Sequence, residues 1–226
     1  MSKEDSIKIV LLGESAVGKT SIIQRFTNDS FDLNCLSSLS AQFNSKTVTV
    51  NGETIKFDVW DTAGQEKYRS LARIFYKDAK VIIFVYDITN LKSFQEIQNY
   101  WYSETKDSCD NDVIYALVGN KSDLYEKEEV NEIDAQKYAD EINAIFKTTS
   151  ALSNVGINNL FENIAQKLLD PNYDYQKGED EQNENNQKQC KNTIKIDNNT
   201  QNNTQNEGGC CNKKKKNKKH KYLNYY

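Results

Sequence analysis

The chain has 226 residues, of which 37% are apolar, a size and composition that allow one compact domain followed by a polar tail. Its net charge of −4 is unevenly placed, because the charged residues of 170–184 are mostly acidic and residues 213–221 are strongly basic, so the average charge identifies no class of partner. Five cysteines, an odd number without the spacing of a metal site, argue against a disulfide framework and are typical of a reducing compartment.

Apolar runs of strand length alternate with helical segments before residue 170. The first run, residues 7–12, is too short for a secretion signal or a membrane span, so we expect a cytosolic protein. It leads into a glycine-rich loop, after which we expect a helix over residues 20–26. Two strand-like runs, residues 43–50 and 54–60, flank Asn51-Gly52 and predict an antiparallel hairpin.

The same alternation continues through the second half of the folded part. It predicts strands over residues 81–86, 113–118 and 144–146, and helices over residues 93–105, 133–142 and 159–169. Together the elements predict a doubly wound α/β sheet of six strands, five of them parallel and one an antiparallel edge strand, with helices on both faces. Ligands of such a sheet bind at the carboxyl ends of its strands.

The composition changes at Asp170 and Pro171, the only proline in the protein. Asn, Gln, Lys and acidic residues dominate from there on, with too few large apolar side chains to offset the entropy cost of ordering the chain. We therefore expect a folded domain over residues 1–169 and a disordered tail over residues 170–226.

A glycine-rich loop with the sequence GESAVGKT occupies residues 13–20, between the first predicted strand and the first predicted helix. This arrangement directs several backbone N–H groups at one anion, and the helix dipole adds to the attraction. Lys19 can bridge the β- and γ-phosphates of a nucleotide, and the Thr20 hydroxyl can ligate Mg²⁺. The pattern predicts a P-loop NTPase, although a tight turn or the loop of an unrelated kinase can carry the same residues.

Three further motifs stand at predicted strand ends. Asp61 can hold Mg²⁺, Gly64 lets its N–H approach the γ-phosphate closely, and Gln65 can orient an attacking water. Asp123 can accept two hydrogen bonds from guanine, whereas adenine would leave it facing a lone pair, a mismatch of roughly 10³-fold in affinity. Asn120 can tie this loop to the phosphate loop. The motifs are DTAGQ at residues 61–65, NKSD at residues 120–123 and TSA at residues 149–151.

With these four motifs in register, residues 7–169 resemble a small GTPase of the Ras superfamily, and specifically its Rab branch. Further Rab-like stretches are KFDVW at residues 56–60, KYRSL at residues 67–71 and YDIT at residues 86–89. The run SAQF at residues 40–43, followed by Lys46-Thr47-Val48, is similar to endosomal Rabs. The resemblance implies a GTP/GDP-cycled switch that regulates vesicle trafficking and hydrolyses GTP to GDP and phosphate.

The resemblance also implies roles for particular residues. Gln65 and Lys19 would be catalytic, and Thr20, Ser38 and Asp61 would ligate Mg²⁺. Phe31 would pack edgewise on guanine, and the Ala151 N–H would meet the guanine oxygen. The nucleotide contacts so implied come from Gly13, Glu14, Ser15, Ala16, Val17, Gly18, Lys19, Thr20, Ser21, Phe31, Ser38, Gly64, Asn120, Lys121, Asp123, Ser150, Ala151 and Leu152.

Some positions depart from the family pattern. Ser38 stands where the family usually has Thr, Leu39-Ser40 where it has Ile-Gly, and Leu152 where it has Lys. Serine keeps the oxygen ligand but loses the methyl group that restricts its rotamer, which would weaken the ordered GTP state by on the order of 1 kcal/mol.

The resemblance implies that effectors contact an aromatic trio between the two switches, the segments around Ser38 and Gly64 that respond to the γ-phosphate. This trio would be Phe43, Trp60 and Tyr76, with Leu39 beside it. As an alternative, the three rings are ordinary partly buried sheet aromatics. Further partners implied are an exchange factor, a GTPase-activating protein that supplies an arginine, and a GDP-dissociation inhibitor or escort protein.

Cys210-Cys211 resembles the double cysteine that receives two geranylgeranyl groups in Rabs, a pair sufficient for stable anchoring. Fifteen residues follow Cys211, seven of them lysine. Three interpretations stay open: a natural end near Cys211, S-acylation beside a polybasic patch that binds anionic lipid, or no lipid. The basic run lacks interleaved aromatic residues, so we expect no specific nucleic acid partner and a protein that cycles onto the cytosolic face of endomembranes, such as endosomes.

Two classes of function remain open from the residues alone. The first is a cycling GTPase, which intact Gly64 and Gln65 favour. The second is a GTP-binding scaffold that hydrolyses too slowly to cycle, which Ser38, Ser40 and Leu152 would suit. A P-loop nucleotide kinase is a third reading, but no segment suggests a second substrate pocket.

Overall fold

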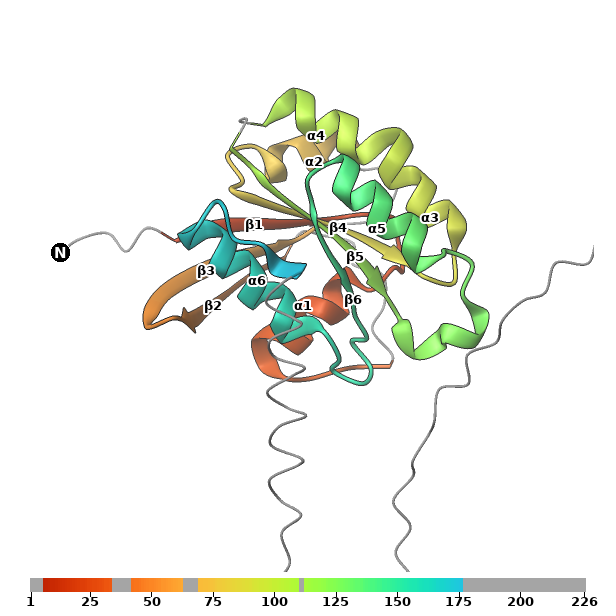
Figure 1. The fold of residues 1–226 in the computed structure, drawn as a ribbon, viewed down its shortest axis with the longest axis horizontal. Coiled ribbons are helices and arrows are strands. Elements are labelled where there is room, and N and C mark those ends of the chain that lie inside the picture. Colours follow the sequence, from red (N-terminus) through yellow and green to blue (C-terminus); the bar gives the residue numbers. More distant parts are fainter. Residues whose placement is uncertain (1–5, 34–41, 63–68, 110–111, 177–226) are drawn as a thin grey trace, which may run out of the picture. The chain divides into compact units, whose positions relative to one another are not determined.

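A computed structural model of the chain describes residues 6–33, 42–62, 69–109 and 112–176. These residues form one six-stranded sheet flanked by helices (Figure 1). The strands are β1 (Ile7–Leu12), β2 (Gln42–Val50), β3 (Glu53–Asp61), β4 (Val81–Asp87), β5 (Ile114–Asn120) and β6 (Ile145–Thr148). The α-helices are α1 (Lys19–Asn28), α2 (Arg69–Tyr76), α3 (Leu91–Glu96), α4 (Tyr102–Ser108), α5 (Glu132–Glu141) and α6 (Ile157–Leu169).

The strand order is β2-β3-β1-β4-β5-β6, and every neighbouring pair is parallel except β2 with β3. The antiparallel pair is the predicted hairpin, whose turn places Asn51 and Gly52 at φ 54° and 83°, as a tight two-residue turn requires. Five parallel strands with one antiparallel edge strand confirm the predicted α/β P-loop NTPase fold. The crossover at β1 makes its carboxyl end the place where loops from both halves of the sheet meet.

Two hydrophobic layers cover the two faces of the sheet. Along β1, Ile9 and Leu11 belong to one layer, while Val10 and Leu12 belong to the other, because successive side chains of a strand point to opposite faces. Helices α1 and α6 pack on the first face, and α2, α3 and α5 pack on the second, which Figure 1 shows with α4 alongside them. Helices on both faces were expected, and this part of the fold is confirmed.

The α1 and α6 layer is held together by stacked aromatic rings. Phe26 of α1 and Phe161 of α6 stack with their centroids 3.5 Å apart, and Phe57 of β3 packs on Phe161 at 6.3 Å. All three side chains are buried. The contact fixes α1, and with it the loop that precedes α1, against the sheet.

The helix expected over residues 93–105 differs in extent and in regularity. It runs from α3 to α4 through one widened turn, Ile97–Trp101, in which the backbone bonds span five residues rather than four. It begins early because the Asn90 side chain accepts a hydrogen bond from Ser93 N and caps the helix. The widened turn buries both Ile97 and Trp101 against β4, which the sequence pattern alone did not predict.

Two short helices were not expected from the sequence. Helix α2 has only eight residues, and a 3₁₀ helix, Ser122–Lys127, follows β5. Both are too short to produce a clear helical period in the sequence.

The described chain continues beyond the expected domain end. Helix α6 ends at Leu169, but the Tyr175 ring packs back on the core layer of α1 and α6, and its hydroxyl lies 3.5 Å from Ala144 O. Residues 170–176 therefore contact the folded part. Within the described ranges, no helix has the length and apolar character that crossing a bilayer requires.

Candidate functional site

The loop of residues 13–20 connects β1 to α1 and lies tightly against two neighbouring strands. Gly13 and Gly18 have φ of 146° and 97°, values that favour glycine. A Cβ at Gly13 would collide with Val85 O of β4, and one at Gly18 would collide with the Asn120 side chain at the end of β5. Larger residues are therefore excluded at both positions, and the loop backbone is fixed at the sheet edge.

Lys19 lies inside this loop and is only 5% exposed. Its Nζ donates hydrogen bonds to Gly13 O at 3.0 Å and Glu14 O at 2.8 Å. Burial lowers the Lys19 pKa to about 8, against the opposing charges of Asp61 and Glu14. A phosphate bound in the loop would compensate the desolvated ammonium, so the geometry fits an anion.

The first turn of α1 offers the same anion its backbone donors. The residue before the helix is Gly18, which has no side chain to cap the first N–H groups. Uncapped N–H groups and the positive end of the helix dipole then point to the same place as Lys19.

Thr20 and Asp61 face each other across the loop. The Thr20 hydroxyl donates to Asp61 Oδ2 at 2.5 Å, and Asp61 is buried at the end of β3. One hydroxyl and one carboxylate are hard oxygen donors, and the described residues hold no cluster of three or more His, Cys, Asp or Glu side chains. This donor set fits Mg²⁺, which takes one or two protein oxygens and otherwise keeps water and phosphate oxygens. When bound, Mg²⁺ would neutralise phosphate charge.

Asn120 joins the phosphate loop to a second loop at the same edge. It is 2% exposed, and its Nδ2 donates to Val17 O at 2.8 Å. Its Oδ1 accepts from the Thr149 hydroxyl at 3.2 Å, and Thr149 N donates to Gly119 O at 2.8 Å. Both ends of the amide are used, so the loops after β1, β5 and β6 form one unit.

Asp123 is held from the loop after β6. Its Oδ1 accepts from the Ser150 hydroxyl at 2.5 Å, while Ser153 N donates to the same hydroxyl at 3.1 Å. The backbone of Ser150 also pairs with Val155 in a short antiparallel bridge. The carboxylate thus has a fixed orientation, which selective recognition of a base requires.

Lys121 lies between these loops with a left-handed φ of 67°. Its Nζ forms an ion pair with Asp87 Oδ2 at 2.6 Å, at the end of β4. Asp87 also accepts hydrogen bonds from the N–H and hydroxyl of Thr89. Asp87 is a site residue that the sequence analysis missed, although it lies in the YDIT stretch that resembled Rabs.

The structure corrects one member of the expected aromatic trio, Tyr76. Tyr76 is only 1% exposed and lies 3.3 Å from Glu104 through its hydroxyl, on the face of the sheet covered by α3 and α5. The Trp60 ring instead has two aromatic neighbours, Phe75 with ring centroids 6.1 Å apart and Phe43 with ring centroids 5.3 Å apart. Phe43 is 52% exposed. The surface aromatic cluster is therefore Phe43, Trp60 and Phe75, one residue away from the expected trio, because helix α2 turns Tyr76 inward.

The structure brings most of the predicted site residues together. Phe31 is partly buried against the layer of α1 and α6, and Ala151 is buried while Leu152 is half exposed. Other expected residues lie outside the described ranges, so the structure gives no account of them: Ser38, Leu39, Gly64, Gln65, Cys210 and Cys211.

Comparison with known proteins agrees with this geometry. The model of the Ras family matches residues 8–170. The Ras-related protein Rab-22A of Homo sapiens is 44% identical over 162 residues, which cover 72% of this chain and 83% of that protein. The Rab-22A proteins of Mus musculus and Canis lupus familiaris show the same identity and coverage. The chain belongs to the Ras family of GTP hydrolases and, within it, is a Rab-type small GTPase, similar to the endosomal Rabs as its sequence predicted.

Proposed function

We propose that this protein is a GTP/GDP-cycled switch that regulates intracellular vesicle trafficking. The observation that carries the proposal is the Asn120 amide, which links the anion-binding loop around Lys19 to the base-reading loop around Asp123. One rigid unit then spans both ends of a guanine nucleotide. The similarity to Rab-22A supports the role in trafficking.

In this proposal the residues of the loops divide the chemistry among them. Lys19 and the amides of residues 13–20 stabilise the charge that develops on the phosphates. Thr20, Ser38 and Asp61 hold Mg²⁺, and Gln65 orients the attacking water. Loss of the γ-phosphate releases the contacts of Ser38 and Gly64, so that the two switch segments relax.

Partners and membrane follow from the same proposal. An exchange factor, an activating protein, and a GDP-dissociation inhibitor or escort protein drive the cycle, and effectors contact Leu39 and the cluster of Phe43, Trp60 and Phe75. Cys210 and Cys211, or the basic run after them, hold the protein on the cytosolic face of endomembranes. Endosomes are the proposed compartment.

Asp123→Asn should exchange the base preference. An amide at this position can donate to the O2 of xanthine but no longer accepts both guanine donors, so GDP affinity should fall by roughly 10²-fold or more while affinity for xanthosine diphosphate rises. Competition binding measures both affinities. Asp134→Asn, an exposed acid on α5 paired with Lys137, is the matched control and should change neither. Unchanged preference for GDP in the first variant would contradict the role of Asp123.

Gln65→Leu should slow hydrolysis and leave binding intact. Removing the group that orients water should lower the single-turnover rate by roughly tenfold or more, within the range of a positioned polar group. Quenched-flow or filter assays with one equivalent of GTP measure the rate. Equal rates in the two proteins would favour the slowly hydrolysing scaffold instead.

The aromatic cluster should decide effector binding through Phe75 rather than Tyr76. For a partner captured by the GTP-loaded and not the GDP-loaded protein, Phe75→Ala should weaken binding by roughly 30-fold, as loss of an interface anchor does. Tyr76→Phe keeps the buried ring and should bind as the unchanged protein does. Calorimetry or surface plasmon resonance gives both constants, and the opposite ranking would restore the expected trio.

The tail proposal is tested by the mass of the protein in its native fractions. Intact and C-terminal peptide masses from membrane and soluble fractions should show two isoprenoid groups on Cys210 and Cys211 of the membrane form. A chain that ends at Tyr226 without isoprenoid would contradict prenylation and leave acylation or the lysine run to bind the membrane.

A further inference from the structure

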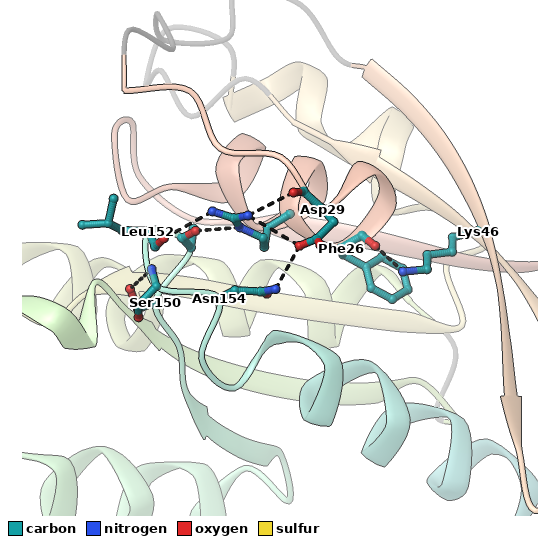
Figure 2. Close-up of polar contacts among 9 residues, drawn as sticks. Phe26, Asp29, Lys46, Ser150, Leu152 and Asn154 are labelled. Carbon is teal, nitrogen blue, oxygen red and sulfur yellow. Dashed lines mark hydrogen bonds and ion pairs between the residues drawn. The ribbon is translucent and has the colours of Figure 1, made fainter. Parts of the chain in front are cut away.

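Arg25 of α1 contacts the loop after β6, although no motif includes Arg25. Its Nε donates to Ala151 O at 3.0 Å and its Nη2 donates to Leu152 O at 3.2 Å. The side chain is 15% exposed. Figure 2 shows this region, in which Asp29 at the end of α1 lies next to Asn154 and Leu152 lies at the opposite end of the group of contacts.

The same guanidinium also contacts Phe31. Its Cζ lies 5.8 Å from the centre of the Phe31 ring, a cation–π arrangement. One side chain therefore touches both elements that the family resemblance assigns to the guanine base, the aromatic ring at its edge and the loop that meets its oxygen.

Asp29 provides a second connection between α1 and the loop after β6. Asn154 Nδ2 donates to Asp29 Oδ1 at 2.9 Å, and Arg25 Nη1 donates to Asp29 O at 3.0 Å. Asp29 has a left-handed φ of 50° and ends α1, so it lies next to the start of the segment that carries Phe31. The end of α1, Phe31 and the loop after β6 are thus joined through Arg25 and Asp29.

These contacts constrain the backbone on both sides of the Ala151 N–H, the group that the resemblance assigns to the guanine oxygen. Two consecutive carbonyls, those of Ala151 and Leu152, are held by one planar group, which fixes the backbone after Ala151. The bonds of Ser150 to Asp123 and Val155 fix the backbone before it. The direction of the Ala151 N–H is therefore set from both sides.

Leu152 takes part in this constraint through its backbone. Its side chain is 48% exposed and cannot provide the charge of the family's usual lysine. What the chain keeps at this position is a backbone carbonyl, and Arg25 binds it.

We propose that Arg25 is a positioning residue for guanine, which holds the loop of residues 150–154 and the Phe31 ring in their binding arrangement and thereby slows nucleotide release. The inference rests on the proposed binding of a guanine nucleotide. Loss of the guanidinium removes the donor from a partly buried carbonyl, that of Ala151, and from an exposed one, that of Leu152. Water can reach the Leu152 carbonyl and replace the donor there, so the order of this loop should suffer more than the fold.

The test measures release of GDP labelled on its ribose with a methylanthraniloyl fluorophore from the full-length protein. Arg25→Met keeps the apolar stem and removes every donor, and release should accelerate roughly tenfold, as loss of about one charged hydrogen bond would cause. Arg25→Lys keeps the charge without the planar guanidinium, so its GDP release rate should lie between those of the unchanged protein and Arg25→Met. Lys137→Met removes an exposed cation on α5 and should release GDP at the unchanged rate.

A second measurement distinguishes a role of Arg25 in orienting the guanine contact from a general contribution to the stability of the fold. The labelled 6-thio analogue of GDP carries a poorer acceptor where the Ala151 N–H should bind, so the unchanged protein should prefer GDP over it. Arg25→Met should narrow this preference. If Arg25 only stabilised the fold, the substitution would lower the melting temperature and leave the preference unchanged. Asn154→Ala removes only the hydrogen bond from Asn154 to Asp29. It should also narrow the preference for GDP over the 6-thio analogue, and it covers the case in which Arg25→Met does not fold.

The outcomes distinguish a failure of guanine binding from a failure of the role of Arg25 alone. If the unchanged protein does not prefer GDP to ADP, the proposed function fails and the inference fails with it. If the unchanged protein prefers GDP but both Arg25 variants release it within twofold of the unchanged rate, the inference alone is overturned.

Discussion

A single buried amide, that of Asn120, connects the parts of this molecule that a nucleotide must contact together. Its position explains the glycine at residue 18, because Asn120 occupies the space that a Cβ on Gly18 would need, and its hydrogen bond to Val17 O holds the same loop. Replacing the amide would free Thr149 and Val17 from each other. The remaining loops would keep their own hydrogen bonds but lose their common frame.

The frame depends in turn on the sheet beneath it. Parallel pairing of β1 with β3 and β4, and of β4 with β5, brings the ends of four strands to one edge. The stacked rings of Phe26 and Phe161 hold α1 against that sheet and so limit how far Lys19 and Thr20 can move. Rigid support with chemically active loops above it is the general arrangement by which α/β sheets bind phosphates.

Sequence reasoning was most accurate where the signal was local. The hairpin turn at Asn51 and Gly52 and the loop of residues 13–20 follow from backbone geometry that few residues tolerate, so both could be predicted. The expected trio was wrong by one residue, because which of Phe75 and Tyr76 faces outward depends on the rotation of α2, and a helix of eight residues leaves no period to read. Arg25 and Asp87 act through partners more than thirty residues away, which no local pattern reveals.

The return of residues 170–176 to the domain has a mechanical consequence. Tyr175 packs on the core, and its hydroxyl also accepts from Gln136 Nε2 at 3.2 Å, so the chain contacts α5 and the residue before β6 after α6 has ended. A pulling force applied through later residues would therefore act first on the contacts of Tyr175. These contacts would have to break before the force could unwind α6 or separate the Phe161 ring from the Phe26 ring.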